Sequence, residues 1–285
     1  DTRDRSEAFT DRLIVELIAQ APAARSMPLD SIFVGGGTPT LLPVPLWSRL
    51  IEALDQHYDL AKIRSGAGEW TVECNPETAS EELFACLHAG GVNRLSMGAQ
   101  SFQVHLLEAL DRRHDPANVY RAIELAKNAG IQRVSVDLIF AIPGQSLDEW
   151  HADLTTAIGL GTTHISAYAL TYEPNTPLTV RLQRGDFQPA PDELELEMFV
   201  HTGRELARHG LDRYEVSNFA RRGDACRHNL TYWRQQPWLA CGPSASGHVH
   251  GANDTGVASH RWKNSPRLDT YLQHSLSGFA PVNEH

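Results

Sequence analysis

The sequence predicts an α/β fold in which parallel strands alternate with helices. Short runs rich in Val, Ile, Leu and aromatic residues are separated by helical patterns, and successive runs begin roughly 25 to 39 residues apart. Repeated strand–helix units of this size are typical of a parallel sheet, either in a barrel or in an open doubly wound sheet. In both architectures ligands bind at the carboxyl ends of the strands.

Five segments are predicted to be buried strands and five to be helices between them. The strand segments do not alternate strictly between polar and apolar residues, which is typical of parallel strands covered on both faces. Ser146 with Glu149 predicts a capped helix start, and Gly130 predicts a helix end. The strands are expected at 31–36, 69–75, 93–100, 132–140 and 163–171, and the helices at 45–57, 79–89, 103–110, 116–129 and 146–159.

The pattern changes after about residue 174, where the turn-rich stretch EPNTPL begins. Another helix is expected at 191–210, followed by a stretch dense in polar and aromatic residues. We therefore expect a barrel core at 1–174, an appendage at the barrel mouth at 175–250, and the start of a C-terminal region, cut short, at 251–285.

Composition excludes several classes of protein. The net charge is −10, from 25 basic and 35 acidic residues, which argues against a general nucleic-acid partner. The cysteines do not form a C-x-x-C pair, so zinc-ribbon and c-type haem attachment have no support. No signal peptide and no run of 18 apolar residues is visible, and we expect a cytoplasmic protein with reduced thiols and without a transmembrane segment. The cysteines are Cys74, Cys86, Cys226 and Cys241.

A glycine loop, Gly35 to Gly37 with Thr38, follows the first predicted strand. It lacks the Lys of a phosphate-binding Walker loop, and Pro39 follows Thr38 directly. It also does not lead straight into a helix, as a Rossmann fingerprint does. The loop offers free backbone groups without a cation, which suits a polar, zwitterionic or neutral group. A tight turn without a ligand is the alternative.

Polar residues stand at the ends of the other predicted strands. Glu73 can accept hydrogen bonds from paired hydroxyls such as those of a ribose, and Gln100 and Asp137 could share that task. Arg112 could hold a carboxylate through two hydrogen bonds. Each residue alone also has an ordinary structural explanation. Together with the glycine loop they suggest an amino acid joined to a nucleoside.

Eight motifs occur in the order known from one family between about residues 31 and 248. On these motifs the chain resembles the radical S-adenosylmethionine (radical SAM) superfamily, its oxygen-independent coproporphyrinogen III oxidase-like family, and the HemW-type haem chaperone branch of that family. The motifs are IFVGGGTPTLL, ECNPET, GVNRLSMGAQSF, LDRRHD, VDLIFAIPGQ, HISAYALTYEPNTPL, YEVSNFAR and CRHNLTYW.

The resemblance implies a partial (β/α)₆ barrel, which in this chain lacks its first strand. It implies that SAM is held by residues from several strand ends. Gly35, Gly36, Gly37 and Thr38 would contact the methionine moiety and Arg112 its carboxylate; Glu73, Gln100 and Asp137 would hold the ribose; Tyr168 and Thr171 would lie along the adenine.

The family's chemistry requires a 4Fe–4S cluster on a C-x3-C-x2-C motif, which would precede this chain. The four cysteines present have the wrong positions and spacing. We therefore expect the chain as given not to bind the cluster, and expect it to be a fragment of a longer protein rather than a relative that has lost the cluster. The chain also begins with Asp1 and not with Met.

The stretch CRHNLTYW resembles a motif tied to haem binding in the chaperone branch. His228 could ligate the iron, and Tyr232 and Trp233 could pack against the porphyrin. Cys226 is a second candidate iron ligand, and Arg227 or Arg234 could pair with propionates. The alternative is a polar loop without a ligand. The other histidines are interpreted as surface or core residues.

Three hypotheses follow. The first is a haem chaperone that binds SAM and haem and transfers haem to acceptor proteins, with an electron donor that the sequence does not identify. The second is an oxidase that decarboxylates coproporphyrinogen III. The third is a cluster-free α/β protein that binds SAM or haem. Whether the chain is an enzyme therefore stays open.

Overall fold

The computed structural model describes residues 2–25, 29–112, 115–174, 176–250, 259–273 and 282–283. The chain forms two compact units, each assembled from segments that are distant in the sequence. The first unit comprises Asp1–Phe33, Leu42–Trp70 and Cys226–His285, and the second comprises Val34–Leu41 and Thr71–Ala225. The division into three segments expected from the sequence remains a prediction.

The main sheet confirms the predicted α/β fold. Its seven strands lie in the order β1-β2-β3-β4-β5-β7-β6. Strands β2 to β5 pair in parallel, whereas β7 runs antiparallel to β5 and to β6. The strands are β1 Ser31–Val34, β2 Glu69–Cys74, β3 Arg94–Gln100, β4 Arg133–Phe140, β5 His164–Ala169, β6 Asp212–Arg213 and β7 Asn218–Ala220.

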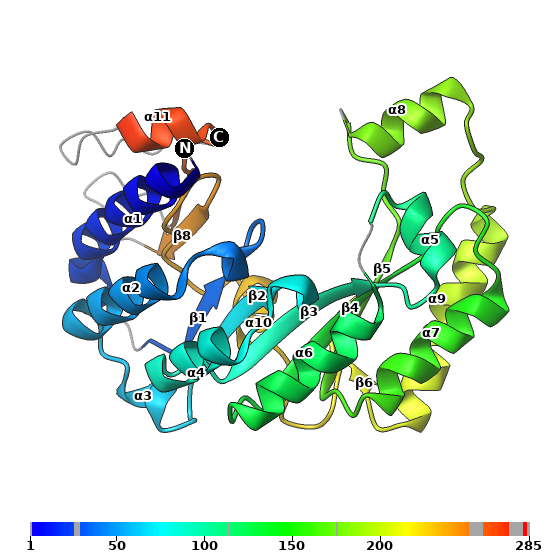
Figure 1. The fold of residues 1–285 in the computed structure, drawn as a ribbon, viewed down its shortest axis with the longest axis horizontal. Helices are drawn as coiled ribbons and strands as arrows, with labels where there is room; N and C mark the ends of the chain where they lie inside the picture. Colours follow the sequence, from blue (N-terminus) through cyan, green and yellow to red (C-terminus); the bar gives the residue numbers. More distant parts are fainter. Residues whose placement is uncertain are drawn as a thin grey trace. The chain divides into compact units, whose positions relative to one another are not determined.

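Helices connect the successive parallel strands (Figure 1). The predicted capping box is present, because the Ser146 side chain accepts from the Glu149 amide while the Glu149 side chain accepts from the Ser146 amide. Gly130 has a φ of 96° just after the helix that it was predicted to end. The helices of the second unit are α4 Glu81–Gly90, α5 Val104–Ala109, α6 Ala117–Asn128, α7 Leu147–Gly159, α8 Pro177–Arg184 and α9 Asp192–Arg208, with short 3-10 helices at Pro39–Leu41 and Pro76–Thr78.

The two faces of strands β2 to β5 differ in chemistry, which corrects one prediction. The pairing of Ser96 with Glu73, and of Asp137 with Gly98 and Ser166, places polar residues on one common face. The intervening residues form a buried apolar face. These strands therefore carry more polar alternation than the sequence analysis expected, although apolar Ile139 also lies on the polar face. The apolar face includes Val72, Leu95, Met97, Val134, Val136, Leu138 and Ile165.

The first unit joins the beginning of the chain to its later segments. Glu16 on the first helix is fully buried, and its carboxylate accepts hydrogen bonds from Tyr271 Oη at 2.6 Å, Asn264 Nδ2 at 2.7 Å and Gly242 N at 3.0 Å. Besides β1, the unit contains α1 Thr2–Ala24, α2 Val44–His57, α3 Ala61–Arg64, α10 Arg227–Trp233, α11 Leu268–Gln273, and an antiparallel sheet of β8 Ser246–His250, β9 Ser259–Lys263 and β10 Val282–Asn283. Within the part of the chain that is described, a helix both long and apolar enough to cross a membrane does not occur.

Candidate functional site

The glycine loop is tied to the neighbouring strand β2 by Glu73. The carboxylate of Glu73 accepts a hydrogen bond from the Gly36 amide at 2.9 Å. Gly36 and Gly37 have φ values of 84° and 131°, which L side chains rarely adopt, and a Cβ at either position would meet no atom within 4 Å. The glycines are therefore required by the backbone conformation, and open space lies beside them.

Burial raises the pKa of Glu73, and the charge of Asp137 raises it further, while the hydrogen bond from Gly36 opposes the shift. The Asp137 carboxylate thus lies near enough to disfavour the ionisation of Glu73. A ligand that donates hydrogen bonds to both carboxylates would stabilise their ionised forms.

Asp137 lies at the centre of the polar face. Its carboxylate accepts from Ser96 Oγ at 3.1 and 3.3 Å, and Ser166 also hydrogen-bonds to it. Burial raises the pKa of Asp137. Hydrogen bonds from the hydroxyls of Ser166, Ser96 and Ser135, and the charge of Arg94, only partly offset that effect. Hydroxyl partners can rotate, so this carboxylate can exchange them for the hydroxyls of a ligand.

Tyr168 extends the polar face at the carboxyl end of β5. Its side chain retains considerable exposure, at 43% for the residue, although burial and the charge of Asp137 raise the pKa of its hydroxyl. Ser166 and Asn218 partly offset this shift. An exposed ring beside buried polar groups can stack on a flat ligand.

Gln100 reaches the same face by an unusual backbone. Its φ is 65°. A Cβ added at Gly98 would lie only 2.6 Å from the side-chain nitrogen Nε2 of Gln100, and Gly98 pairs with Asp137 on the neighbouring strand. Gly98 therefore leaves room for the Gln100 side chain over the polar face.

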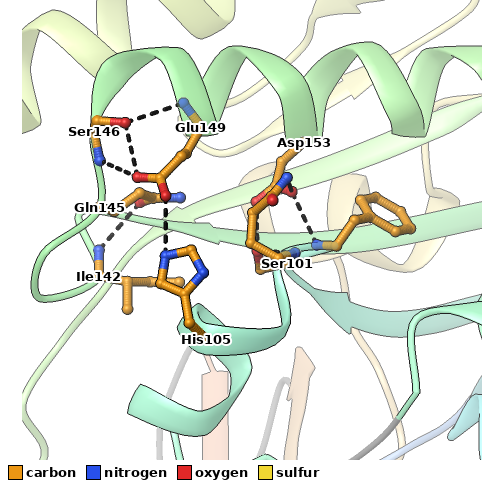
Figure 2. A network of polar contacts seen from close by, with 9 residues as sticks. Ser101, His105, Ile142, Gln145, Ser146, Glu149 and Asp153 are labelled. Atoms are coloured by element: carbon orange, nitrogen blue, oxygen red, sulfur yellow. Dashed lines mark hydrogen bonds and ion pairs between the residues drawn. The ribbon is translucent and has the colours of Figure 1, made fainter.

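The turn after Gln100 is held by Asp153 on α7, as Figure 2 shows. Asp153 is fully buried and accepts from Ser101 Oγ at 2.6 Å, Phe102 N at 2.9 Å and Gln103 Nε2 at 3.3 Å. The Ser101 hydroxyl also accepts from the Gln103 amide at 3.0 Å. This network fixes the turn that presents Gln100.

A second group of polar contacts, also drawn in Figure 2, holds the beginning of α7. His105 Nε2 contacts Glu149 Oε1 at 2.9 Å, and the other oxygen of Glu149 accepts from the Ser146 amide at 2.8 Å. The hydrogen bonds from the Ser146 backbone and hydroxyl lower the pKa of Glu149, and His105 adds to that effect. These contacts link α5 to α7 beside the turn after Gln100.

The structure ties the remaining predicted SAM residues less closely to the polar face. Gly35 is exposed, Thr38 is half-buried with its carbonyl accepting from Leu41 N at 3.0 Å, and Thr171 is exposed beyond β5. Arg112 is exposed beyond α5, and the structure does not bring its side chain into the described network. Their assignment to SAM stays a prediction.

Sequence reasoning missed Ser96, Ser166 and Asn218 on the polar face, and Thr40 beneath the glycine loop. Thr40 Oγ1 accepts from Asn75 N at 3.2 Å and from Thr78 Oγ1 at 2.6 Å, which ties the loop to the end of β2. The available signal was the alternation of small polar and apolar residues within each strand.

The cysteines of the described residues do not fit a 4Fe–4S cluster. Cys74 is buried, which raises the pKa of its thiol to about 12, and burial raises the pKa of Cys241 as well. The Cys226 thiol lies 3.4 Å from Glu69 Oε1. In the described part of the chain, cysteines are absent from every group of three or more side chains close enough to share a metal ion.

The predicted haem residues lie on the short helix α10 of the first unit. The His228 ring stacks on Phe33, with centroids 4.5 Å apart and planes inclined by 12°, and meets the edge of Tyr232 at 4.6 Å. Tyr232 in turn contacts Trp238 at 4.5 Å. Tyr232 is 41% exposed and Trp233 57% exposed. A half-buried imidazole thus lies beside the exposed ring of Tyr232, and the exposed Trp233 is on the same helix.

The start of α10 is fixed by a carboxylate. Arg227 N donates to Glu69 Oε1 at 2.9 Å, and the Arg227 guanidinium donates to the carbonyl of Ala67. Arg227 is therefore already engaged, whereas Arg234 is exposed. The motif forms a helix and not the polar loop that the sequence left open.

Comparison with known proteins identifies the family. The sequence matches the Radical SAM superfamily over residues 2–157. The chain belongs to the radical SAM superfamily. Within it, the chain belongs to the group whose curated members are named heme chaperone HemW. It is 35% identical over 251 residues to the Bacillus subtilis protein of that name and 32% identical over 276 residues to the Lactococcus lactis one.

These alignments cover 88% and 96% of the chain, but 65% and 72% of the two relatives. The chain therefore spans about two thirds of their length. Among solved structures, coproporphyrinogen III oxidase (HemN) from Escherichia coli matches with a TM-score of 0.76 at 21% identity, covering 94% of this chain and 62% of that protein. This match shows that the radical SAM fold is shared.

Proposed function

We propose that the chain is the SAM-binding and haem-binding part of a haem chaperone. It binds haem on α10 and passes it to acceptor proteins, and SAM occupies the polar face of the main sheet. The name of the relatives supports the haem and acceptor parts of this proposal. A 4Fe–4S cluster in the whole protein would need cysteines other than the four of this sequence.

SAM fits the polar face through its hydrogen-bonding groups. Glu73 and Asp137 accept from the ribose hydroxyls, and Gln100 lies over the same face. The loop from Gly35 to Thr38 supplies free backbone groups for the methionine moiety, with Arg112 at its carboxylate. Tyr168 and Thr171 lie along the adenine.

Haem fits α10 because His228 can supply an imidazole nitrogen to iron while Tyr232 and Trp233 cover apolar porphyrin surface. The observation that carries this part is the half-buried His228 ring with the exposed Tyr232 ring beside it, on a short helix that also carries the exposed Trp233. Single exposed aromatic residues are ordinary, but two on the same short helix as a potential iron ligand favour an apolar, flat ligand there.

The test is a haem titration followed by absorption spectroscopy. We expect His228→Ala to change the Soret band and weaken haem binding at least about tenfold, the scale of one lost favourable contact of 1.4 kcal/mol. Trp233→Ala should weaken binding less and leave the Soret position unchanged, because that side chain supplies contact area and not the iron ligand. SAM affinity should stay unchanged in both variants.

His260→Ala is the matched control, since His260 also stacks on an aromatic ring, that of Trp262, at 6.0 Å. Haem binding by His228→Ala equal to that of the wild type and of His260→Ala would refute the axial-ligand assignment. Consumption of coproporphyrinogen III by the whole protein, with SAM and a reductant under anaerobic conditions, would favour an oxidase instead of a chaperone.

A further inference from the structure

Two helices of the second unit bring together three side chains that the proposed function does not use. His151 lies on α7, and His201 and Glu205 lie on α9. One potential ligand atom from each residue lies within 4.8 Å of the others, and His151 Nδ1 is 3.0 Å from His201 Nε2. His151 is exposed, His201 is half-buried and Glu205 is buried.

The positions of the two histidines are fixed by their immediate neighbours. Trp150 Nε1 donates to Thr202 Oγ1 at 2.9 Å, and both residues are almost completely buried. The Thr202 hydroxyl in turn donates to the Met198 carbonyl at 2.7 Å. Because Trp150 precedes His151 and Thr202 follows His201, this contact sets the register of the two imidazoles across the helix pair.

The spacing of the ligand atoms suits a transition-metal ion. His201 and Glu205 are four residues apart, so they share one face of α9. Two nitrogens that each lie about 2.0–2.1 Å from a tetrahedral Zn²⁺ are about 3.3 Å apart, close to the 3.0 Å between the two imidazoles. Small rotations of the rings would therefore admit the ion.

The charges around the three residues also suit a cation. Burial lowers the pKa of His201, and the neighbouring His151 lowers it further; a metal binds an imidazole in its neutral form. Glu205 brings a negative charge, and its oxygens are oriented by His209 at 3.3 Å and Arg208 at 3.1 Å. Metal-binding carboxylates are commonly held by such outer hydrogen bonds.

We propose that His151, His201 and Glu205 form a binding site for Zn²⁺ that links α7 to α9. Three protein ligands leave the fourth position of a tetrahedral ion for water. Two nitrogens and one carboxylate oxygen are a ligand set that Zn²⁺ accepts, and the soft cysteine ligands of other zinc sites are not needed. This site is separate from the residues proposed for SAM and haem.

The test is a titration of the metal-free protein with Zn²⁺ by calorimetry, and with Co²⁺ by absorption spectroscopy. We expect one ion per chain, cobalt bands without thiolate charge transfer, and an increase in the thermal unfolding midpoint with added Zn²⁺. His151→Ala and His201→Ala should each weaken binding at least tenfold and abolish that increase.

His105→Ala is the matched control, since it removes another histidine that pairs with a carboxylate, Glu149, on α7. It should bind Zn²⁺ as the wild type does. Because His151 is exposed, its alanine variant is expected to keep the wild-type circular dichroism. Equal Zn²⁺ affinity in His151→Ala, His201→Ala and the wild type, no binding by the wild type, or cobalt bands with thiolate charge transfer would each overturn the proposal.

Discussion

Two carboxylates of the second unit, Asp137 and Asp153, differ in their hydrogen-bond partners and exposure. Burial raises the pKa of both. Asp153 is fully buried, and its oxygens are used by a backbone amide and two side chains of a single turn. Asp137 is only half-buried and is surrounded by serine hydroxyls on the polar face.

Burial and a raised pKa therefore do not by themselves mark a binding residue. The partners do. Asp153 is fully buried and joins three donors of one turn, so it supports the fold, whereas Asp137 keeps some exposure beside serine hydroxyls and is available to a ligand. The same substitution, Asp to Asn, should therefore act oppositely at the two positions.

The largest expected effect on folding is at Asp153. Asp153→Asn replaces one acceptor oxygen with an amide group that can only donate, so one of the three donors of the turn loses its acceptor. We expect the free energy of unfolding to fall by about 2 kcal/mol, the cost of one buried unsatisfied donor. Urea denaturation at pH 7 measures it, and an unchanged midpoint would show that the turn does not depend on Asp153.

A smaller effect of opposite sign is expected at Asp137. Its folded-state pKa is raised, so its contribution to stability is greatest below the unfolded pKa and is lost as pH rises through the folded pKa. Without SAM, Asp137→Asn should thus be more stable than the wild type at pH 7, by up to about 1 kcal/mol. The difference should shrink as pH falls below about 4, where Asp is protonated in both states. A less stable variant at pH 7 would contradict the pKa direction.

Much of the fold was predictable because its signals are local. The five predicted strands and the capping box at Ser146 depend on short patterns in the sequence, and the structure confirms these elements. Helix α10 and the β8–β9 pair were not predicted, since neither carries a strong periodic pattern. The serines within strands were overlooked because a small polar residue in an apolar run does not indicate which face it occupies.

The candidate site was predictable only in part for a similar reason. Glu73, Gln100 and Asp137 stand near strand ends, where ligands of α/β folds bind. Asn218 reaches the polar face through β7, an antiparallel strand that pairs with β5 from more than 50 residues further along the chain. Such a pairing depends on tertiary structure that no local pattern specifies. The role of Asp153 depends likewise on the packing of α7 against the turn after β3.

The assignment of the polar face to SAM is tested by the affinity for SAM of Asp137→Asn and of Glu73→Gln, measured by calorimetry at pH 7. Hydrogen bonds to charged groups contribute about 1.5–3 kcal/mol each, so each variant should bind at least about tenfold more weakly and the double variant about a hundredfold or more. Asp224→Asn is the control, because it removes another carboxylate of the second unit, paired with Arg133 at 3.0 Å. Weaker binding in the Asp137 and Glu73 variants, with wild-type binding in the control, is the result expected. Wild-type affinity in the double variant would contradict the assignment of the polar face to SAM.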